Sequence, residues 1–124
     1  MQSAPEFSAG EWFQLAIADR ESDLLIGDIG VCVSGEGSEA EIGFTLSRES
    51  QGRGLASEAV KLILAVLFAG TDVRRIFAIT DARNAAANKL LLALGLQHTE
   101  SKGAIFRNEV CIEHTYSILR QDGI

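Results

Sequence analysis

Two neighbouring stretches, Glu-Ile-Gly-Phe-Thr-Leu at residues 41–46 and Gln-Gly-Arg-Gly-Leu-Ala at residues 51–56, decide the fold of this chain. Apolar side chains alternate with polar or small ones along the first stretch, which predicts a half-buried strand. Beyond the second, residues 57–69 repeat apolar side chains at the spacing of one helix face, so a helix is expected directly after the glycines. A strand, a glycine-rich turn and a long apolar helix therefore follow one another.

The other elements are predicted outward from this centre. Alternating or continuous apolar runs indicate strands, and helical spacing indicates a second helix. We expect the two helices to end at Gly70 and Gly95, because glycine adopts the backbone angles that terminate a helix. The predicted strands are residues 12–18, 25–33, 40–46, 75–80 and two within 96–119, and the predicted helices are residues 57–69 and 84–94.

This order, β-β-β-α-β-α-β-β, predicts an α/β fold of the α+β mixed-sheet kind, with helices packed on the sheet. A right-handed crossover through the first helix would make the strands at residues 40–46 and 75–80 parallel neighbours. Residues 75–80 are apolar on both faces, which predicts a central strand of a covered sheet. The loop at residues 51–56 would then lie at the carboxyl end of a strand, where such sheets bind ligands.

Length and charge limit the classes of function. The 124 residues fit a single domain over residues 1–124, with an N-terminal extension at residues 1–11 and a core at residues 12–119. The net charge of −6 argues against nucleic-acid binding, which depends on basic side chains. Residues 1–11 lack a signal-peptide pattern, and the longest apolar stretch is far shorter than the about 20 residues of a membrane span. We therefore expect a cytoplasmic protein that binds neither nucleic acid nor membrane.

A few reactive side chains lie outside the glycine-rich loop. Cys32 and Cys111 match neither a zinc nor a redox spacing, and we expect two buried thiols, with a disulfide as the alternative. His98 and His114 are expected at the surface, and Tyr116 is expected to pack in the core. No metal site is predicted.

The glycine-rich loop has the chemistry of an anion site. Gly52 and Gly54 allow backbone N–H groups to approach an anion closely, and the following helix directs its positive end to the same point. The alternative is that the glycines only permit a tight turn. The loop fits neither the nucleotide-triphosphate nor the dinucleotide glycine motif, since it lacks the Gly-Lys-Ser/Thr of the first and the third glycine of the second.

Several segments resemble the GNAT family of N-acetyltransferases, in the family's order. The loop fits the family motif Gln/Arg-x-x-Gly-x-Gly/Ala, and the resemblance extends from about Trp12 to Leu119. The branch that modifies the N-termini of ribosomal proteins is the most similar. The matching segments are Ile26-Gly27-Asp28-Ile29-Gly30, Glu41-Ile42-Gly43-Phe44-Thr45-Leu46, Gln51-Gly52-Arg53-Gly54-Leu55-Ala56, Asp81-Ala82-Arg83-Asn84, Leu94-Gly95-Leu96 and Tyr116-Ser117-Ile118-Leu119.

The resemblance implies a GNAT acyl-CoA N-acyltransferase fold and acetyl-CoA as cosubstrate. Asn84 would bond the pantetheine arm, with a plain helix cap as the alternative. Lys89 would reach a phosphate of the nucleotide, with a solvated surface lysine as the alternative. The backbone of Phe44, Thr45 and Leu46 would pair with the pantetheine, and the amides of Gln51, Gly52, Arg53, Gly54, Leu55 and Ala56 would hold the pyrophosphate.

The resemblance also implies a reaction, transfer of the acetyl group to a primary amine of a small molecule or a protein N-terminus. Glu41 is the candidate general base, with an ordinary exposed carboxylate as the alternative. Ala87 and Leu91 stand where relatives carry an acid for the leaving thiolate, so a weakly active acyl-CoA-binding module is the second hypothesis and a structural partner domain the third. Relatives also begin with a strand and two helices for which residues 1–11 offer no room, so we expect the strand at residues 12–18 to have a free edge and the chain to form a homodimer.

Overall fold

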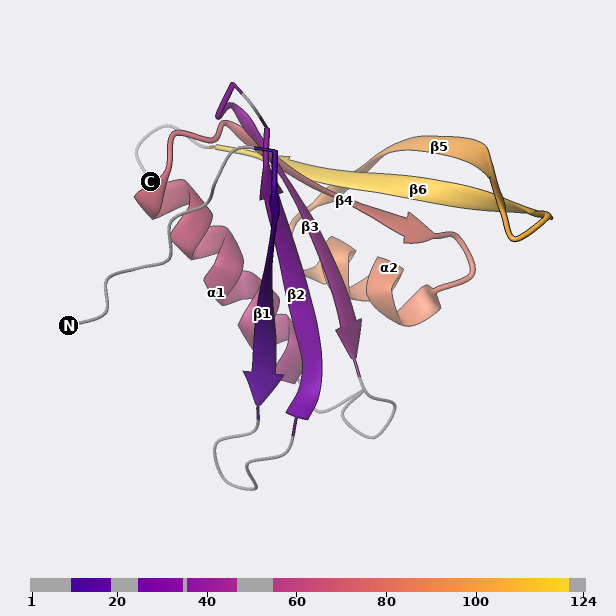
Figure 1. Cartoon of the computed structure of the whole chain (residues 1–124), viewed down its shortest axis with the longest axis horizontal. Helices are drawn as coiled ribbons and strands as arrows, with labels where there is room; N and C mark the ends of the chain where they lie inside the picture. Colours follow the sequence, from indigo (N-terminus) through magenta and orange to yellow (C-terminus); the bar gives the residue numbers. More distant parts are fainter. Residues whose placement is uncertain (1–9, 19–24, 35, 47–54, 121–124) are drawn as a thin grey trace.

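The computed structural model describes residues 10–18, 25–34, 36–46 and 55–120 of the chain (Figure 1). Its elements follow the predicted order, and their bounds differ from the predicted ones by two residues or fewer, except within residues 96–119, where the division between two strands was left open. They are β1 (Trp12–Ala18), β2 (Leu25–Val33), β3 (Glu39–Leu46), α1 (Leu55–Gly70), β4 (Arg75–Asp81), α2 (Ala85–Ala93), β5 (Gln97–Phe106) and β6 (Glu109–Leu119).

The strands form one mixed sheet in the order β1-β2-β3-β4-β6-β5. The opening strands pair antiparallel, β3 and β4 pair parallel, and β6 runs antiparallel to both of its neighbours. The predicted mixed sheet and the predicted parallel neighbours on either side of α1 are therefore confirmed. Within the described residues, β1 is an edge strand of this sheet.

The parallel pair separates along its length. β3 pairs with β4 only from Glu39 opposite Arg75 to Ile42 opposite Ala78. Beyond that point the two strands diverge, as Figure 1 shows, and residues 43–46 have no partner on β4. The sheet therefore opens at the carboxyl ends of β3 and β4.

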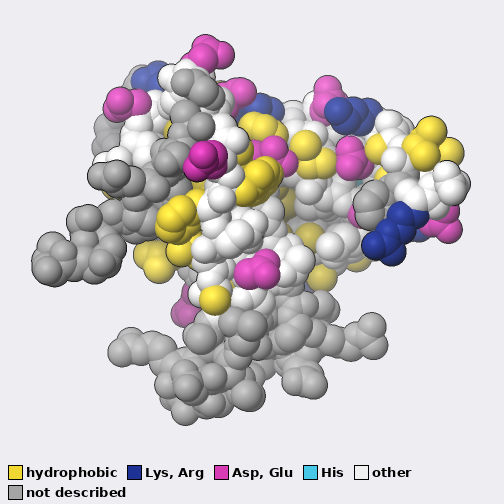
Figure 2. Space-filling view, in the orientation of Figure 1, with side chains coloured by type: hydrophobic (Ala, Val, Ile, Leu, Met, Phe, Trp, Pro, Cys, Tyr) yellow, Lys and Arg dark blue, Asp and Glu magenta, His cyan; other side chains and the backbone are white. Residues whose placement is uncertain are grey.

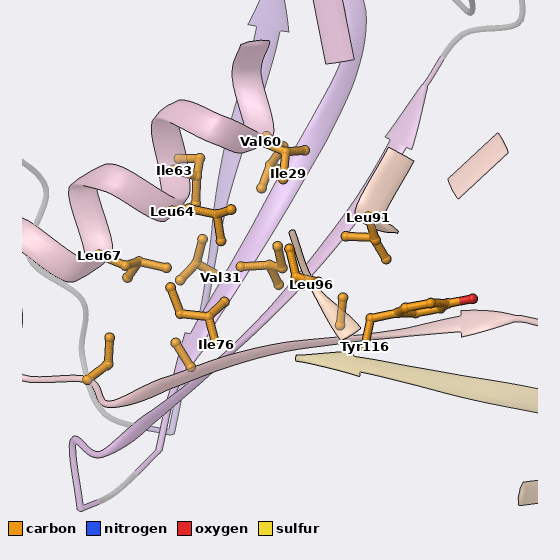
Figure 3. Close-up of a cluster of buried hydrophobic side chains, with 14 of the residues drawn as sticks. Ile29, Val31, Val60, Ile63, Leu64, Leu67, Ile76, Leu91, Leu96 and Tyr116 are labelled. Carbon is orange, nitrogen blue, oxygen red and sulfur yellow. The ribbon is translucent and has the colours of Figure 1, made fainter. Parts of the chain in front are cut away.

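One face of the sheet carries the hydrophobic core. Side chains of β2, β3 and β4 meet the apolar stripe of α1, and Leu91 of α2 meets Leu96 and Tyr116 at the other end (Figure 3). Tyr116 is only 3% exposed, so its predicted packing is confirmed. The fully buried large side chains of this core are Ile29, Ile42, Leu67, Ile76, Leu91, Leu96, Val31, Val60 and Val73.

The opposite face is less covered than predicted. Phe77 is half-buried and Ile79 is 37% exposed, so the expectation that β4 is covered on both faces is wrong for the described residues. Right-handed crossovers explain the difference. β3, β4 and β5 run in the same direction, and the crossovers from β3 to β4 and from β4 to β5 both move toward the β5 edge of the sheet. Two right-handed crossovers of this kind place α1 and α2 on the same side of the sheet. We call the other side the open face.

Both cysteines are free, and the predicted disulfide alternative is not formed. Cys32 and Cys111 are only partly buried, so the expectation of fully buried thiols is wrong. The cause is position in the sheet. By strand alternation Cys32 points to the open face, away from its buried neighbours Val31 and Val33.

The carboxyl end of α1 is held from a distant part of the chain. Gly70 is the last helical residue, as predicted, and the last turn of α1 contains no basic side chain. Arg120 supplies this charge instead. Its guanidinium donates hydrogen bonds to the carbonyls of Phe68 (2.6 Å), Thr71 (2.8 Å) and Val73 (2.9 Å).

Candidate functional site

The open end between β3 and β4 brings together the first group of predicted site residues. Phe44, Thr45 and Leu46 all lie on the part of β3 that has left β4. Phe44 is partly buried against the core, and the Thr45 hydroxyl donates to the Asp28 carboxylate at 2.8 Å. The backbone of this segment pairs with β2 on one side only, so within the described residues its other side faces the opening.

The amino end of α1 lies at the same end of the sheet as this opening (Figure 1). Leu55 and Ala56 are the first residues of the helix, and Ala56 is 7% exposed. Glu58 in the first turn suits the positive end of the helix dipole. Gln51, Gly52, Arg53 and Gly54 lie outside the described residues, so their predicted contacts with a pyrophosphate remain a prediction.

The connection between β4 and α2 is a tight turn held by Asp81. Its side chain accepts a hydrogen bond from the backbone N–H of Arg83 at 2.8 Å, and its carbonyl accepts one from the N–H of Asn84 at 2.9 Å. Asn84 then caps α2, since its side-chain oxygen accepts from the N–H of Ala87 at 3.2 Å. The capping role of Asn84 is confirmed, and its contact with a pantetheine arm remains a prediction.

An exposed ion pair reinforces this turn. The Arg83 guanidinium donates to both carboxylate oxygens of Asp81, at 3.0 and 2.8 Å. These side-chain bonds, together with the backbone bond from Arg83, lower the pKa of Asp81 to about 2. Asp81 is therefore ionised at neutral pH. Its carboxylate accepts hydrogen bonds but binds protons too weakly to act as a general base.

Glu41 lies where the strands begin to separate. It is opposite Cys32 of β2 and Phe77 of β4, one residue before the last pair of β3 with β4. By strand alternation it points to the open face, where it is half-buried. Burial, and then the negative charge of Glu113, raise the pKa of Glu41 above its usual range. A carboxylate in this condition is a better proton acceptor than an ordinary one.

Two further predicted positions are on α2. Lys89 is exposed, which agrees with the alternative of a solvated lysine, and its contact with a phosphate remains a prediction. Ala87 and Leu91 are both buried in the core. The two positions at which the resemblance implies an acid are thus part of the hydrophobic packing here.

Some residues near the site were not predicted from the sequence. Glu113 comes within electrostatic range of Glu41 only through the pairing of β6 with β4, which no local pattern shows. The Thr80 hydroxyl donates to the Asn88 side chain, which in turn donates to the carbonyl of Ala82 at 3.2 Å. These contacts join the free end of β4 to α2.

A separate pocket of about 640 Å³ opens at the other end of β4, where Arg75, Arg120 and Ser117 are among its lining residues. The Arg75 guanidinium is already paired with Glu39 at 3.0 Å and lies over the Phe77 ring. This pocket is therefore distinct from the opening between β3 and β4. Among the described residues, no group of three or more His, Cys, Asp or Glu side chains could hold a metal, and no helix is long and apolar enough to cross a membrane.

Comparison with known proteins identifies the family of this chain. The family model of the acetyltransferase (GNAT) domain matches residues 2–97. The chain is 35% identical over 89 residues to the uncharacterized N-acetyltransferase p20 of Bacillus licheniformis, covering 71% of this chain and 50% of that protein. It thus spans about half the length of the curated relatives that it matches.

Solved structures show the same fold. The ribosomal-protein-S5-alanine acetyltransferase of Vibrio fischeri superposes with a TM-score of 0.80 at 23% identity, over 90% of this chain and 63% of that one. A variant of the spermidine N-acetyltransferase of Vibrio cholerae superposes with a TM-score of 0.77 at 19% identity, over 87% and 65% of the two chains. With the family model matching more than half of its length, the chain belongs to the GNAT acetyltransferase family.

Proposed function

We propose that this protein is an N-acetyltransferase that transfers the acetyl group of acetyl-CoA to a primary amine. The observation that carries the proposal is the separation of β3 from β4 beyond Ile42, next to the amino end of α1. The opening leaves one side of residues 43–46 available to a strand-like ligand. The glycine-containing motif at residues 51–56 leads directly into that helix.

We propose that the following residues hold acetyl-CoA without a metal. The backbone of Phe44, Thr45 and Leu46 would hold the pantetheine arm, because an extended amide chain pairs with a free strand side as another strand does. Amides within residues 51–56 would hold the pyrophosphate at the positive end of α1. Asn84 uses one lone pair of its side-chain oxygen as a cap, and its amide N–H₂ would donate to the ligand.

Glu41 would be the general base. Acetyl-CoA supplies a thioester carbonyl that a neutral amine attacks, which forms an amide and releases the CoA thiolate. Glu41 would take the proton of the amine, directly or through one water, because it lies where the opening begins and its pKa is raised. Positioning of the two substrates supplies much of the acceleration in such transfers.

The acceptor would be a cationic amine, either a small molecule or a protein N-terminus. Asp28, Glu41 and Glu113 all lie on the open face by strand alternation, and acidic and hydrophobic side chains lie near one another in Figure 2. Acidic groups attract an amine that is protonated in solution. The comparisons include enzymes that by name act on spermidine and on ribosomal proteins, which is consistent with both kinds of acceptor.

We further propose that the chain works as a homodimer in the cytoplasm. Within the described residues β1 has no strand on its outer side, and Trp12 on it is 49% exposed. A free apolar edge favours association. Light scattering at micromolar concentration tests this proposal, and a fully active monomer of about 13 kDa would contradict it.

The test of the function is release of free thiol from acetyl-CoA with a panel of polyamines, small monoamines and peptides with free N-termini. We expect turnover with at least one cationic amine and none with N-blocked peptides. Calorimetric binding of CoA, measured in parallel, distinguishes an active enzyme from the second candidate function, an acyl-CoA-binding module without turnover. Tight CoA binding without turnover on any amine would favour an acyl-CoA-binding module, which the buried Ala87 and Leu91 already suggest. Absence of both would contradict the proposal.

A further inference from the structure

The fold brings together the two histidines of the chain, His98 on β5 and His114 on β6. Their ring centroids are 4.3 Å apart. Both rings contact the same hydroxyl, since Ser101 Oγ lies 2.8 Å from His98 Nε2 and 2.8 Å from His114 Nδ1. We call these three residues the His–Ser–His cluster.

An irregularity in β5 creates the cluster. Residues three apart on a regular strand point to opposite faces. Here the register shifts between His98, opposite Tyr116, and Glu100, opposite Thr115, so Thr99 is the extra residue of a bulge. The bulge returns Ser101 to the face of His98 and places it directly opposite His114. Bulges of this kind re-aim side chains near functional sites.

The cluster presents four donor atoms of the kinds that metals bind. Besides the two imidazole nitrogens and the Ser101 hydroxyl, the carbonyl oxygen of Glu100 lies 3.0 Å from His98 Nε2. His98 and Ser101 are exposed, so a metal ion can reach the cluster from solvent. Two nitrogen donors with oxygen donors suit the late first-row divalent metals, and Mg²⁺ prefers oxygen alone.

The hydrogen bonds are satisfied by the following arrangement of protons. Because the Glu100 carbonyl only accepts, His98 Nε2 carries a proton and donates it. The Ser101 hydroxyl can then accept from His98 and donate to His114 Nδ1, which leaves that nitrogen unprotonated. The lone pair of His114 Nδ1 is directed at the cluster. His98 would free its own lone pair by moving its proton to Nδ1, with no change in net charge.

We propose that the His–Ser–His cluster is a binding site for one divalent metal ion of the Zn²⁺, Cu²⁺ or Ni²⁺ class. His98 Nε2 and His114 Nδ1 are the nitrogen ligands, and Ser101, the Glu100 carbonyl and water complete the coordination. The ion replaces the hydrogen bonds that now pass through the Ser101 hydroxyl. The site is separate from the opening between β3 and β4 and does not depend on the proposed function.

The site joins β5 to β6, and β6 pairs with β4 at the opening. His114 is opposite Thr80, on the part of β4 that has separated from β3. Thr80 in turn contacts Asn88 of α2. A bound ion would therefore fasten the outer strand of the sheet to the elements that border the opening.

Zn²⁺ titration of the full chain, in competition with a chromophoric chelator, tests the proposal. We expect one Zn²⁺ per chain. His98→Ala and His114→Ala should each weaken binding roughly tenfold or more, because loss of a ligand costs at least as much as loss of its supporting contacts. Ser101→Ala should weaken binding less than either. The double variant Cys32→Ser/Cys111→Ser should bind like the parent, which excludes the thiols.

Two measurements guard against variants that lose their fold. Far-UV circular dichroism compares each variant with the parent, and His98→Asn serves as a second, polar replacement at the exposed position. In the parent, NMR of the two imidazole side chains should show both rings shifting on addition of Zn²⁺. The proposal would be overturned by any of three results. These are ring signals that do not change on addition of Zn²⁺, folded histidine variants that bind Zn²⁺ as tightly as the parent, or displacement of Zn²⁺ by an excess of Mg²⁺.

Discussion

Glu41 of β3 and Glu113 of β6 lie on the same face of the sheet, and the charge of Glu113 adds to burial in raising the pKa of Glu41. The two residues are far apart in sequence, and β4 lies between their strands. Two negative carboxylates within electrostatic range of each other repel. The pair therefore destabilises the fold at neutral pH while making Glu41 a better base.

The first prediction concerns the stability of Glu41→Gln. The pKa of Glu41 is raised in the folded state, so the folded protein holds this proton more tightly than the unfolded chain. The charged form then costs folding free energy at neutral pH, and this cost disappears as the pH falls below the ordinary glutamate pKa of 4.5. We expect a higher Tm for Glu41→Gln than for the parent at pH 7 and equal values near pH 4.

The same variant should lose turnover while binding CoA normally, and the low-pH limb of the kcat/KM profile should disappear. Glu113→Gln is the matched control. It should lower the pKa read from that limb but keep activity. If Glu41→Gln keeps the parent's pH–rate profile, Glu41 is not the base.

A second prediction separates the two roles of Asn84. Asn84→Ala removes the cap of α2 and should cost about 1 kcal/mol of stability, measured by urea unfolding. Asn84→Asp keeps the capping oxygen but replaces the amide N–H₂, so it should keep the stability of the parent. Weaker CoA binding by Asn84→Asp would show that the amide also bonds the ligand. Equal CoA binding would leave Asn84 as a cap alone.

The third prediction is that Gly54→Val abolishes CoA binding. The motif at residues 51–56 requires close approach of backbone N–H groups to phosphate, and a β-branched side chain obstructs it. Gly103→Val is the control, because a side chain added at Gly103 of β5 meets nothing within 4 Å. Calorimetry with CoA should show loss of binding for the first variant only. Parent-like binding by a folded Gly54→Val would remove the loop from the cofactor site.

The sequence predicted the elements, their order and the parallel pair, because these follow from local periodicity and from the handedness of crossovers. It also gave a helix cap as one of two roles for Asn84, since a capping side chain acts within one turn of its own position. Residues 41–46 could be identified as a strand, but the pattern does not show that β4 leaves β3 after Ile42.

What the sequence did not predict depends on register between distant strands. Glu113 influences the pKa of Glu41, and His114 contacts His98, only after β6 has paired with β4 and β5. The bulge at Thr99 carries no glycine or proline that would indicate it. Both helices pack on one side of the sheet and leave the other side open. The apolar neighbours of Cys32 do not show which side that is, so its partial exposure could not be predicted from them.

A fourth prediction concerns the ion pair in the turn before α2. Arg83→Met removes the side-chain bonds that hold the pKa of Asp81 at about 2, so that pKa should rise toward its ordinary value of 3.8. A lowered folded pKa stabilises the fold above the unfolded value, and this contribution is lost as the pH falls from about 4 to about 2. NMR titration of the Asp81 carboxyl is the measurement. A pKa unchanged by Arg83→Met would mean that the Arg83 side chain does not set it.

The last prediction is that Arg120 contributes more to the free energy of unfolding than any other charged side chain of the described residues. Its guanidinium donates to three carbonyls that follow or end α1, those of Phe68, Thr71 and Val73, and it lies 5.2 Å from the centre of the Phe68 ring. Arg120→Met keeps the length of the stem but leaves these carbonyls without their donor.

Hydrogen bonds from charged groups contribute about 1.5–3 kcal/mol each and are not additive, so we expect a loss of roughly 3 kcal/mol in urea unfolding. Arg120→Lys should recover only part of it, because an ammonium cannot match the planar fork that reaches three acceptors. Arg74→Met is the control, since the Arg74 side chain is exposed and its backbone hydrogen bonds remain. If Arg120→Met and Arg74→Met unfold at the same urea concentration, α1 does not depend on a charge supplied from the end of β6.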